Sequence, residues 1–273
     1  AATIVGTEGD DDINGTPGDD IIAGLGGSDR IEGRGGNDLI CGDDGNDDLI
    51  GGDGNDQLIG GAGNVVRNLV AFGAKADLVA AVGDDTAGAE LTALLAATTG
   101  ADAHLVTVPG RRTTIKTRFV AGGQQLLRAD HEAEIKIDEL GRKALLARAM
   151  AALEGCAALI LSDYGKGVLD PDTMAALIAA AARDGKPVIV DPKGADYSRY
   201  RGATLLTPNR SELAEASGMP VADDDAIVAA CQKIISQCGV RAVLATRSER
   251  GMTLVDGGAV HHLPARAQAV FDV

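Results

Sequence analysis

The chain has 273 residues, of which 45% are hydrophobic, so it is long enough for one large or two modest domains with a sizeable core. Its formal net charge of −15 excludes nucleic acid as a partner, because phosphate binding requires clusters of Lys and Arg. No apolar run reaches the roughly 18 residues that a membrane span requires, and the 4 cysteines include no CxxC pair and predict no disulfide framework.

The acidic residues are concentrated near the start of the chain. Residues 1–64 carry 15 acidic and 2 basic side chains, a net charge of −13, whereas residues 65–273 carry the other 25 acidic and 23 basic side chains, a net charge of −2. Such asymmetry predicts two parts with different functions. We place the first part at residues 1–59 and the second at residues 60–273.

The first part is built from a nine-residue repeat. Six copies between residues 6 and 59 follow the pattern G-x-x-G-x-D-x-U-x, in which U is a large aliphatic residue. Glycine permits turns with positive φ and close backbone approach, and the aliphatic residue is expected to point inward from a short strand. Carboxylate oxygens are the ligands that Ca²⁺ prefers. The candidate calcium ligands are therefore Asp11, Asp20, Asp29, Asp38, Asp47 and Asp56.

This pattern resembles the repeats-in-toxin (hemolysin-type) calcium-binding repeats. The resemblance implies a short parallel β-roll that holds Ca²⁺ in its turns and an aliphatic ladder inside. Without Ca²⁺ the aspartates repel one another and the core is thin, so we expect disorder. The alternative, an acidic Gly-rich linker, does not explain why Ile or Leu keeps its phase in every copy.

The second part alternates between helices and short aliphatic strands, which predicts an α/β fold with a doubly wound, mainly parallel sheet and helices on both faces. Helices are expected at 64–72, 87–98, 138–154, 171–184, 210–217 and 223–237. Extended segments are expected at 77–84, 104–108, 113–120, 124–129, 157–163, 187–191, 204–207 and 242–247, and a hairpin-like segment is expected at 252–264.

Six short motifs follow one another in this part. They are GGAGNVVRNL at 60–69, LVAAVGDD at 78–85, SDYGKG at 162–167, DPKG at 191–194, TPNRSE at 207–212 and TRSERGM at 246–252. In this order they resemble the ribokinase (PfkB-type) carbohydrate kinases. Two further segments, QQLLRAD at 124–130 and the run 196–212, are most similar to D-glycero-β-D-manno-heptose-7-phosphate kinase, the first domain of the bifunctional ADP-heptose synthesis enzyme.

The resemblance implies an activity and its partners. It implies ATP-dependent phosphorylation of heptose 7-phosphate at the anomeric hydroxyl with Mg²⁺, which belongs to the supply of lipopolysaccharide core precursors, and it implies a homodimer. It also implies a cytoplasmic location, although the repeats alone are typical of secreted proteins. No signal peptide is predicted, because residues 1–10 have neither a basic nor an apolar region.

The resemblance also assigns site residues. In the family, the Asn and Glu of N-x-x-E organise nucleotide phosphates and Mg²⁺, and the loop after the last parallel strand contacts the nucleotide. The nucleotide-binding candidates are Lys193, Asn209, Arg210, Ser211, Glu212, Thr246, Ser248 and Gly251. The substrate-binding candidates are Gly60, Gly61, Asn64, Lys116, Arg118, Gln125, Arg128 and Asp163. The plain alternative is that Asn209 and Glu212 form a helix-capping box and that Lys193 is a surface residue.

The defining segment of the family is D-x-T-G-A-G-D, which supplies an anion hole and the catalytic base. Asp272 matches its first Asp and Val273 is the last residue, so we expect the base beyond residue 273 and little or no turnover by this chain. The repeats also stand where the family has its first strand. Two other interpretations stay open: a non-enzymatic calcium-binding secreted or surface module with a passenger kinase fragment, and a truncated or rearranged reading frame.

Overall fold

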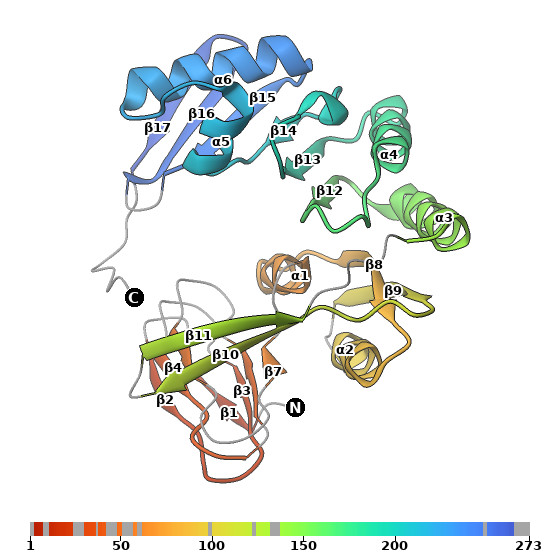
Figure 1. Ribbon diagram of the computed structural model, residues 1–273, viewed down its shortest axis with the longest axis vertical. Helices are drawn as coiled ribbons and strands as arrows, with labels where there is room; N and C mark the ends of the chain where they lie inside the picture. Colours follow the sequence, from red (N-terminus) through yellow and green to blue (C-terminus); the bar gives the residue numbers. More distant parts are fainter. Residues whose placement is uncertain are drawn as a thin grey trace.

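The computed structural model shows a repeat region and a larger α/β region (Figure 1). It describes residues 3–7, 11–23, 30–36, 38–41, 48–50, 57–58, 62–97, 100–121, 124–131, 137–247 and 250–264.

The repeat region consists of short strands in two parallel sheets. Its strands are β1 (Ile4–Val5), β2 (Asp12–Asn14), β3 (Ile21–Ala23), β4 (Arg30–Glu32), β5 (Leu39–Cys41), β6 (Asp48–Ile50) and β7 (Gln57–Leu58). Odd-numbered strands form one sheet, in the order β1-β3-β5-β7, and even-numbered strands form the other, in the order β2-β4-β6. Each strand therefore pairs with the strand two repeats away, as Ile22 does with Ile40.

The aliphatic position of the repeat points inward, as predicted. Ile13, Ile22, Ile31 and Ile40 form one buried cluster, and each is at most 8% exposed. Glycine is required where the layers meet: a Cβ on Gly15 would lie 2.4 Å from the carbonyl oxygen of the glycine at 33. The repeat region thus has a ladder of isoleucines for its core.

The α/β region begins with two parallel strands and a hairpin. Its first elements are α1 (Ala62–Ala71), β8 (Ala76–Gly83), α2 (Thr86–Ala97), β9 (Ala101–Val108), β10 (Ile115–Ala121), β11 (Gln124–His131) and α3 (Glu139–Gly155). Strands β8 and β9 form a parallel pair that lies between α3 and α2 (Figure 1). Strands β10 and β11 form a separate antiparallel pair with an irregularity at Phe119/Val120.

A six-stranded sheet follows, in the order β12-β13-β14-β15-β16-β17. Its elements are β12 (Leu159–Ser162), α4 (Pro171–Arg183), β13 (Val188–Asp191), η1 (Ser198–Tyr200), β14 (Leu205–Leu206), α5 (Arg210–Ser217), α6 (Asp224–Cys238), β15 (Ala242–Thr246), β16 (Met252–Asp256) and β17 (Ala259–Leu263). Strands β12 to β15 run parallel, and β16 and β17 complete the sheet as an antiparallel hairpin.

The main core lies between this sheet and the helices that follow its strands. Leu177 of α4, Leu213 of α5 and Ile234 of α6 are buried against Val190 and Val243 of the sheet. Cys231 and Cys238 are also buried on α6, one face of which therefore packs inward as their spacing predicts.

The predicted elements agree with the structure to within about three residues, and the α/β class is confirmed. The parallel strands of the α/β region form two separate sheets, however. Strand β8 pairs with β9 and strand β12 pairs with β13, and no pairing joins the two sheets in the described ranges. Helix α3 spans the division, since it contacts β8, β9 and α4. None of the helices in the described ranges combines the length and apolarity needed to cross a bilayer.

Candidate functional site

The carboxyl ends of β12, β13, β14 and β15 bring the predicted nucleotide-site residues to one edge of the six-stranded sheet. Asp163 follows β12, Asp191 ends β13 and Lys193 lies two residues later. Asn209 follows β14 and forms an isolated parallel bridge with Thr246 at the end of β15. Residues from four segments of the chain are therefore adjacent at this edge.

Asn209 and Glu212 form a complete capping box at the start of α5. The Asn209 Oδ1 accepts from the Glu212 backbone N–H (2.9 Å), and Glu212 Oε2 accepts from the Asn209 backbone N–H (3.0 Å). The other carboxylate oxygen of Glu212 lies 2.8 Å from the Lys193 ammonium, and this contact raises the pKa of Lys193. The capping interpretation and the site interpretation therefore apply to the same two residues.

Asp163 is held in a buried network. Its carboxylate accepts from the Gly165 backbone N–H (2.8 Å), the Arg199 guanidinium (2.5 Å) and the Tyr200 hydroxyl (2.7 Å). The Gly165 N–H binds one carboxylate oxygen, Arg199 and Tyr200 bind the other, and the side chain is 4% exposed. Predicted as a substrate contact, Asp163 is placed by the structure in contact with Arg199 and Tyr200.

Acidic groups gather at this edge. Burial is the main cause that raises the pKa of Asp191, and the neighbouring Glu212 and Asp163 raise it further, whereas Lys193 lowers it. Within the described ranges, no three His, Cys, Asp or Glu side chains converge closely enough to hold a metal ion by themselves. Mg²⁺ commonly takes one or two protein carboxylates together with substrate phosphates and water, so a Mg²⁺–nucleotide fits this edge.

The loop after β15 is closed by Arg247. The Arg247 backbone N–H donates to the carbonyl of Gly251 (2.8 Å), and its guanidinium donates to the carbonyl of Arg250 (3.1 Å) and pairs with Asp224 of α6. Gly251 has a φ of 79°, which favours glycine. Arg247 thus joins the two described ends of this segment, 247 and 250–251, and Ser248 lies outside the described residues.

The other two predicted residues of this group lie in the first turn of α5. The Arg210 guanidinium donates to the carbonyl of Val221 (3.1 Å), which directs it toward the segment before α6. Ser211 is exposed.

The predicted sugar-side residues are only partly described. Gly60 and Gly61 lie outside the described residues, and Asn64 is described only as a backbone position in α1. Apart from Asp163, described above, the remaining four occupy the hairpin: Arg118 stands directly opposite Arg128 in register, and the positions of Lys116 and Gln125 pair with Asp130 and Val120. The backbone places these positions on one hairpin, and their side chains lie outside the described set.

The GDD sequence at the end of β8, residues 83–85, forms a second cluster of hydrogen bonds, for which the sequence predicted no role. The Asp85 carboxylate accepts from the Thr113 hydroxyl (2.7 Å), the Thr113 backbone (2.8 Å) and the Gly88 backbone (2.9 Å). A Cβ on Gly83 would lie 2.2 Å from the Arg111 carbonyl, so only glycine fits there. Asp85, Arg199, Tyr200 and Arg247 had no assigned role, although each stands in a motif or run that carries the family resemblance.

The repeat aspartates are described at three of six positions. The Asp11 and Asp20 carboxylates accept from the backbone N–H groups of Thr7 and Thr16, at 2.6 Å each, and this contact with Thr16 lowers the pKa of Asp20. Asp38 is 1% exposed and accepts from the Asp20 backbone N–H (2.9 Å). Two of these carboxylates, those of Asp20 and Asp38, are buried at equivalent positions of the stacked repeats, and carboxylate oxygens are ligands that Ca²⁺ prefers. Asp29, Asp47 and Asp56 lie outside the described residues.

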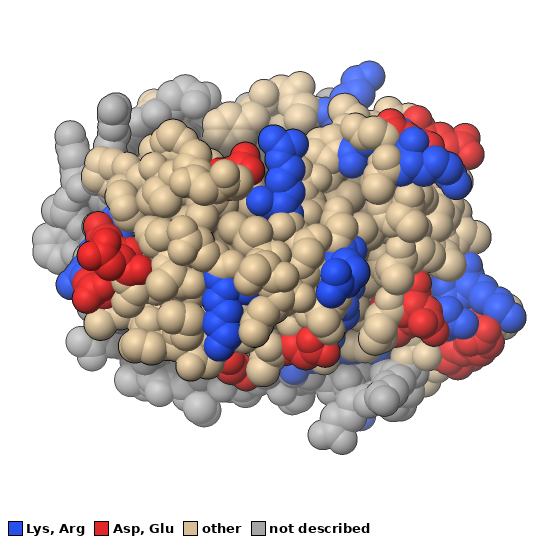
Figure 2. All heavy atoms as spheres, turned by 90° about the horizontal axis from the view of Figure 1, so that it is seen from above, with Lys and Arg blue, Asp and Glu red and all other residues tan. Residues whose placement is uncertain are grey.

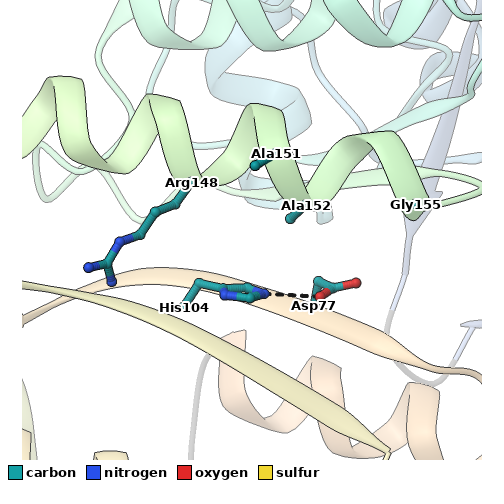
Figure 3. A pocket seen from close by; sticks show the side chains of 6 residues that line it. All are labelled: Asp77, His104, Arg148, Ala151, Ala152 and Gly155. Atoms are coloured by element: carbon teal, nitrogen blue, oxygen red, sulfur yellow. Dashed lines mark hydrogen bonds and ion pairs between the residues drawn. The ribbon is translucent and has the colours of Figure 1, made fainter.

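A hollow of about 390 Å³ lies away from the carboxyl edge, between α3 and the β8–β9 pair (Figure 3). Within it, His104 Nε2 is 3.0 Å from the Asp77 carboxylate (Figure 3). The thiol of Cys156, which follows the lining residue Gly155, donates to the same carboxylate (3.4 Å). Burial and Asp77 raise the pKa of Cys156, which keeps the thiol protonated. Asp77 lies at the amino end of β8, whereas the predicted site residues follow carboxyl ends.

On the face of the molecule seen in Figure 2, Lys and Arg side chains are dispersed among uncharged residues, with separate acidic groups between them.

Comparisons with known proteins match both regions. Residues 37–273 match the pfkB family carbohydrate kinases, and residues 5–40 match the RTX calcium-binding nonapeptide repeat. Over 211 residues, the chain is 54% identical to the bifunctional protein HldE of Rhodospirillum rubrum and, at the same identity, to that of Paramagnetospirillum magneticum. These alignments cover 77% of this chain and 42% and 43% of those proteins, so the chain spans less than half the length of these relatives.

Solved structures show the same fold. Phosphofructokinase-2 from Escherichia coli, in complex with substrates and products, matches with a TM-score of 0.60 and 23% identity, over 77% of this chain and 68% of that chain. Ribokinase from Giardia lamblia matches with a TM-score of 0.57 and 21% identity, over 71% of this chain and 59% of that chain. At these identities the likeness concerns the fold alone.

Proposed function

The chain belongs to the pfkB family of carbohydrate kinases, and from this premise we propose that its α/β region, residues 60–273, binds ATP with Mg²⁺ and a sugar phosphate. The observation that carries the proposal is the set of residues at the carboxyl edge. There Lys193 supplies a positive charge and Asp191 and Glu212 supply the oxygens that a hydrated Mg²⁺ takes. Bound ATP would supply the phosphoryl group, and these side chains would orient its phosphates.

The proposed sugar is D-glycero-β-D-manno-heptose 7-phosphate, phosphorylated at its anomeric hydroxyl. Two kinds of support favour it: the 54% identity to HldE, and the heptose-kinase-like segments 124–130 and 196–212. The basic positions 116, 118 and 128 on the β10–β11 hairpin suit a substrate that carries its own phosphate. We propose that these positions bind the 7-phosphate.

The test begins with binding to this chain. Calorimetric titration with ATP and Mg²⁺ is expected to show binding that is weakened by Lys193→Ala and unchanged by Arg183→Ala, because the Arg183 side chain is 76% exposed on α4 and pairs with its neighbour Asp184. A folded protein that does not bind ATP would contradict the proposal. Competition between heptose 7-phosphate, fructose 6-phosphate and ribose tests the sugar, and preference for either of the last two would exclude heptose 7-phosphate. Phosphorus NMR measures turnover in the same samples.

For residues 1–59 we propose calcium binding as a second function, which the match to RTX calcium-binding repeats and the buried Asp20 and Asp38 favour. The carboxylates of Asp11, Asp20, Asp29, Asp38, Asp47 and Asp56 would act with turn carbonyls as ligands. Terbium luminescence, displaced by Ca²⁺, measures this binding without reference to kinase activity. Binding that survives simultaneous Asp→Asn substitution at Asp20 and Asp38 would exclude these two ligands.

A further inference from the structure

The backbone of Lys193 is held on both sides by two residues of η1. The Lys193 N–H donates to the Tyr200 hydroxyl (3.0 Å), and the Lys193 carbonyl accepts from the Arg199 guanidinium (2.6 Å). Lys193 lies in the connection between β13 and η1, where no ladder hydrogen bond fixes the chain. Its position therefore depends on these contacts.

The Tyr200 hydroxyl is saturated by this arrangement. A phenol offers one donor and two acceptor sites. The acceptor sites are taken by the Lys193 N–H and the Arg199 guanidinium (2.8 Å), and the donor goes to Asp163 Oδ2 (2.7 Å). Burial raises the pKa of Tyr200 to about 12, so the hydroxyl keeps its proton at neutral pH. Tyr200 is fully buried and does not face a ligand.

Asp163 completes the assembly from the neighbouring strand end. Its two oxygens accept from Gly165, Arg199 and Tyr200, and it is 4% exposed. Both oxygens are thus engaged inside the protein and almost closed to solvent, which is a poor position for contacting a sugar. The side chain of Lys193, in contrast, is 52% exposed and reaches Glu212. Of the residues in this network, Lys193 is therefore the one that extends to the site.

From this geometry we infer that Asp163, Arg199 and Tyr200 are positioning residues that clamp the backbone of Lys193, and that they affect nucleotide binding through Lys193 without touching the nucleotide. The inference rests on the proposed nucleotide site. It changes the role of Asp163 from a sugar contact, as predicted from the sequence, to a support for the phosphate-binding lysine. It also gives a role to Arg199 and Tyr200.

A double-mutant cycle between Tyr200→Phe and Lys193→Ala tests the inference, with the Kd for ATP–Mg²⁺ measured by calorimetry on the whole chain. Tyr200→Phe alone is expected to weaken binding by about 3- to 10-fold, the usual size of coupling between contacting residues. In the Lys193→Ala background the same change is expected to have no further effect. An equal loss in both backgrounds, or no loss in a folded Tyr200→Phe protein, overturns the inference.

A second variant covers the case in which Tyr200→Phe does not fold. Asp163→Asn keeps the size of the side chain and is expected to raise the Kd for ATP while leaving the Kd for heptose 7-phosphate unchanged. The reverse pattern would make Asp163 a sugar contact and overturn the inference. ATP binding by the unmodified chain is measured before any variant, because a chain that does not bind ATP would contradict the proposed function itself. Arg183→Ala serves as the matched surface control, with thermal unfolding as the check on folding.

Discussion

The repeat region and the α/β region use aspartate in different ways. In the repeats, an aspartate recurs every nine residues and Asp38 is 1% exposed beside a core of single isoleucines. In the α/β region, Asp163 is equally enclosed, yet Arg199 and Tyr200 neutralise and bind it. A buried carboxylate needs such partners or a metal ion. At Asp163 the α/β region supplies an arginine and a tyrosine hydroxyl as partners, whereas for the repeat aspartates we propose Ca²⁺ in addition to their hydrogen bonds.

The hydrophobic cores of the two regions differ in extent. The α/β core joins residues from the sheet and from α4, α5 and α6, and the repeat core is a row of Ile13, Ile22, Ile31 and Ile40 with Ile4 beside it. Apolar burial is the dominant favourable term in folding, so a thin core leaves more of the stability to the ligand. This comparison predicts that ligand removal unfolds one region and leaves the other folded.

Calcium removal gives the largest expected effect. Chelation is expected to remove the β structure of residues 1–59 and to leave the α/β region folded, because Ca²⁺ at 100 times its Kd contributes about 2.7 kcal/mol to the state that binds it. Circular dichroism with and without EGTA, combined with limited proteolysis, measures this outcome. Loss of the α/β core in the same step would show that the regions unfold together and would break the comparison.

Truncation of a core isoleucine in each region sharpens the comparison. Ile234→Ala in α6 and Ile31→Ala in the repeats both empty fully buried sites, 1% and 0% exposed, and each is expected to cost about 2–5 kcal/mol of unfolding free energy in its own region. Only Ile31→Ala is expected to weaken calcium binding. Urea unfolding at saturating and at zero Ca²⁺ distinguishes the two variants. A calcium dependence of the Ile234→Ala effect would contradict the assignment of calcium dependence to the repeats alone.

Local sequence patterns predicted most elements, for physical reasons that particular residues show. In α4, Asp170 caps the first turn and Pro171 stands at its start, and Gly218 and Gly239 end α5 and α6 in the left-handed conformation. The nine-residue period fixed which isoleucine points inward. The division into two sheets was not predictable, because the absence of pairing between β8 and β12 in the described ranges depends on contacts between residues far apart in the chain.

The sequence predicted that the candidate nucleotide-site residues lie near one another, but not how they contact their neighbours. Asn209, Glu212, Lys193 and Thr246 do lie together, because parallel strands carry the residues after them to one edge. The clamp on Lys193 was missed, since nothing in the local pattern around Tyr200 shows that its hydroxyl reaches Asp163, 37 residues away. Tertiary contacts of this kind leave no periodic signal in the sequence.

A smaller effect is expected at the helix caps. Asn209→Ala and Asp138→Ala each remove the side-chain acceptor at the start of a helix, α5 or α3, and each is expected to cost about 0.5–2 kcal/mol. Both caps stabilise the fold, but only Asn209 also holds Glu212, the partner of Lys193. The Kd for ATP–Mg²⁺ is therefore expected to rise for Asn209→Ala alone. Equal Kd values for the two variants would show that Asn209 caps α5 without contributing to nucleotide binding.

The smallest effect is expected from pH, and it separates the regions by their dependence on calcium. The Thr113 hydroxyl is the main cause that lowers the pKa of Asp85 below its ordinary value of 3.8, with the Thr113 and Gly88 backbones adding to it. A depressed folded-state pKa gives stability that is present above 3.8 and is lost as the pH falls through the folded value. Because Asp85 is partly exposed, solvent screening keeps the effect small.

The measurement compares the unfolding free energy of the wild-type α/β region with that of Asp85→Asn between pH 2 and pH 6. The difference is expected to be constant above about pH 5 and to shrink in more acidic solution, whether Ca²⁺ is present or not. The pKa of Asp20 is also lowered, chiefly by the Thr16 backbone, so acid is expected to destabilise the repeats as well. There, bound Ca²⁺ must compete with protons for the carboxylates, and the acid midpoint is expected to move with calcium concentration. A calcium-independent midpoint in the repeats would mean that their aspartates are stabilised by hydrogen bonds, as Asp85 is, and not by the ion.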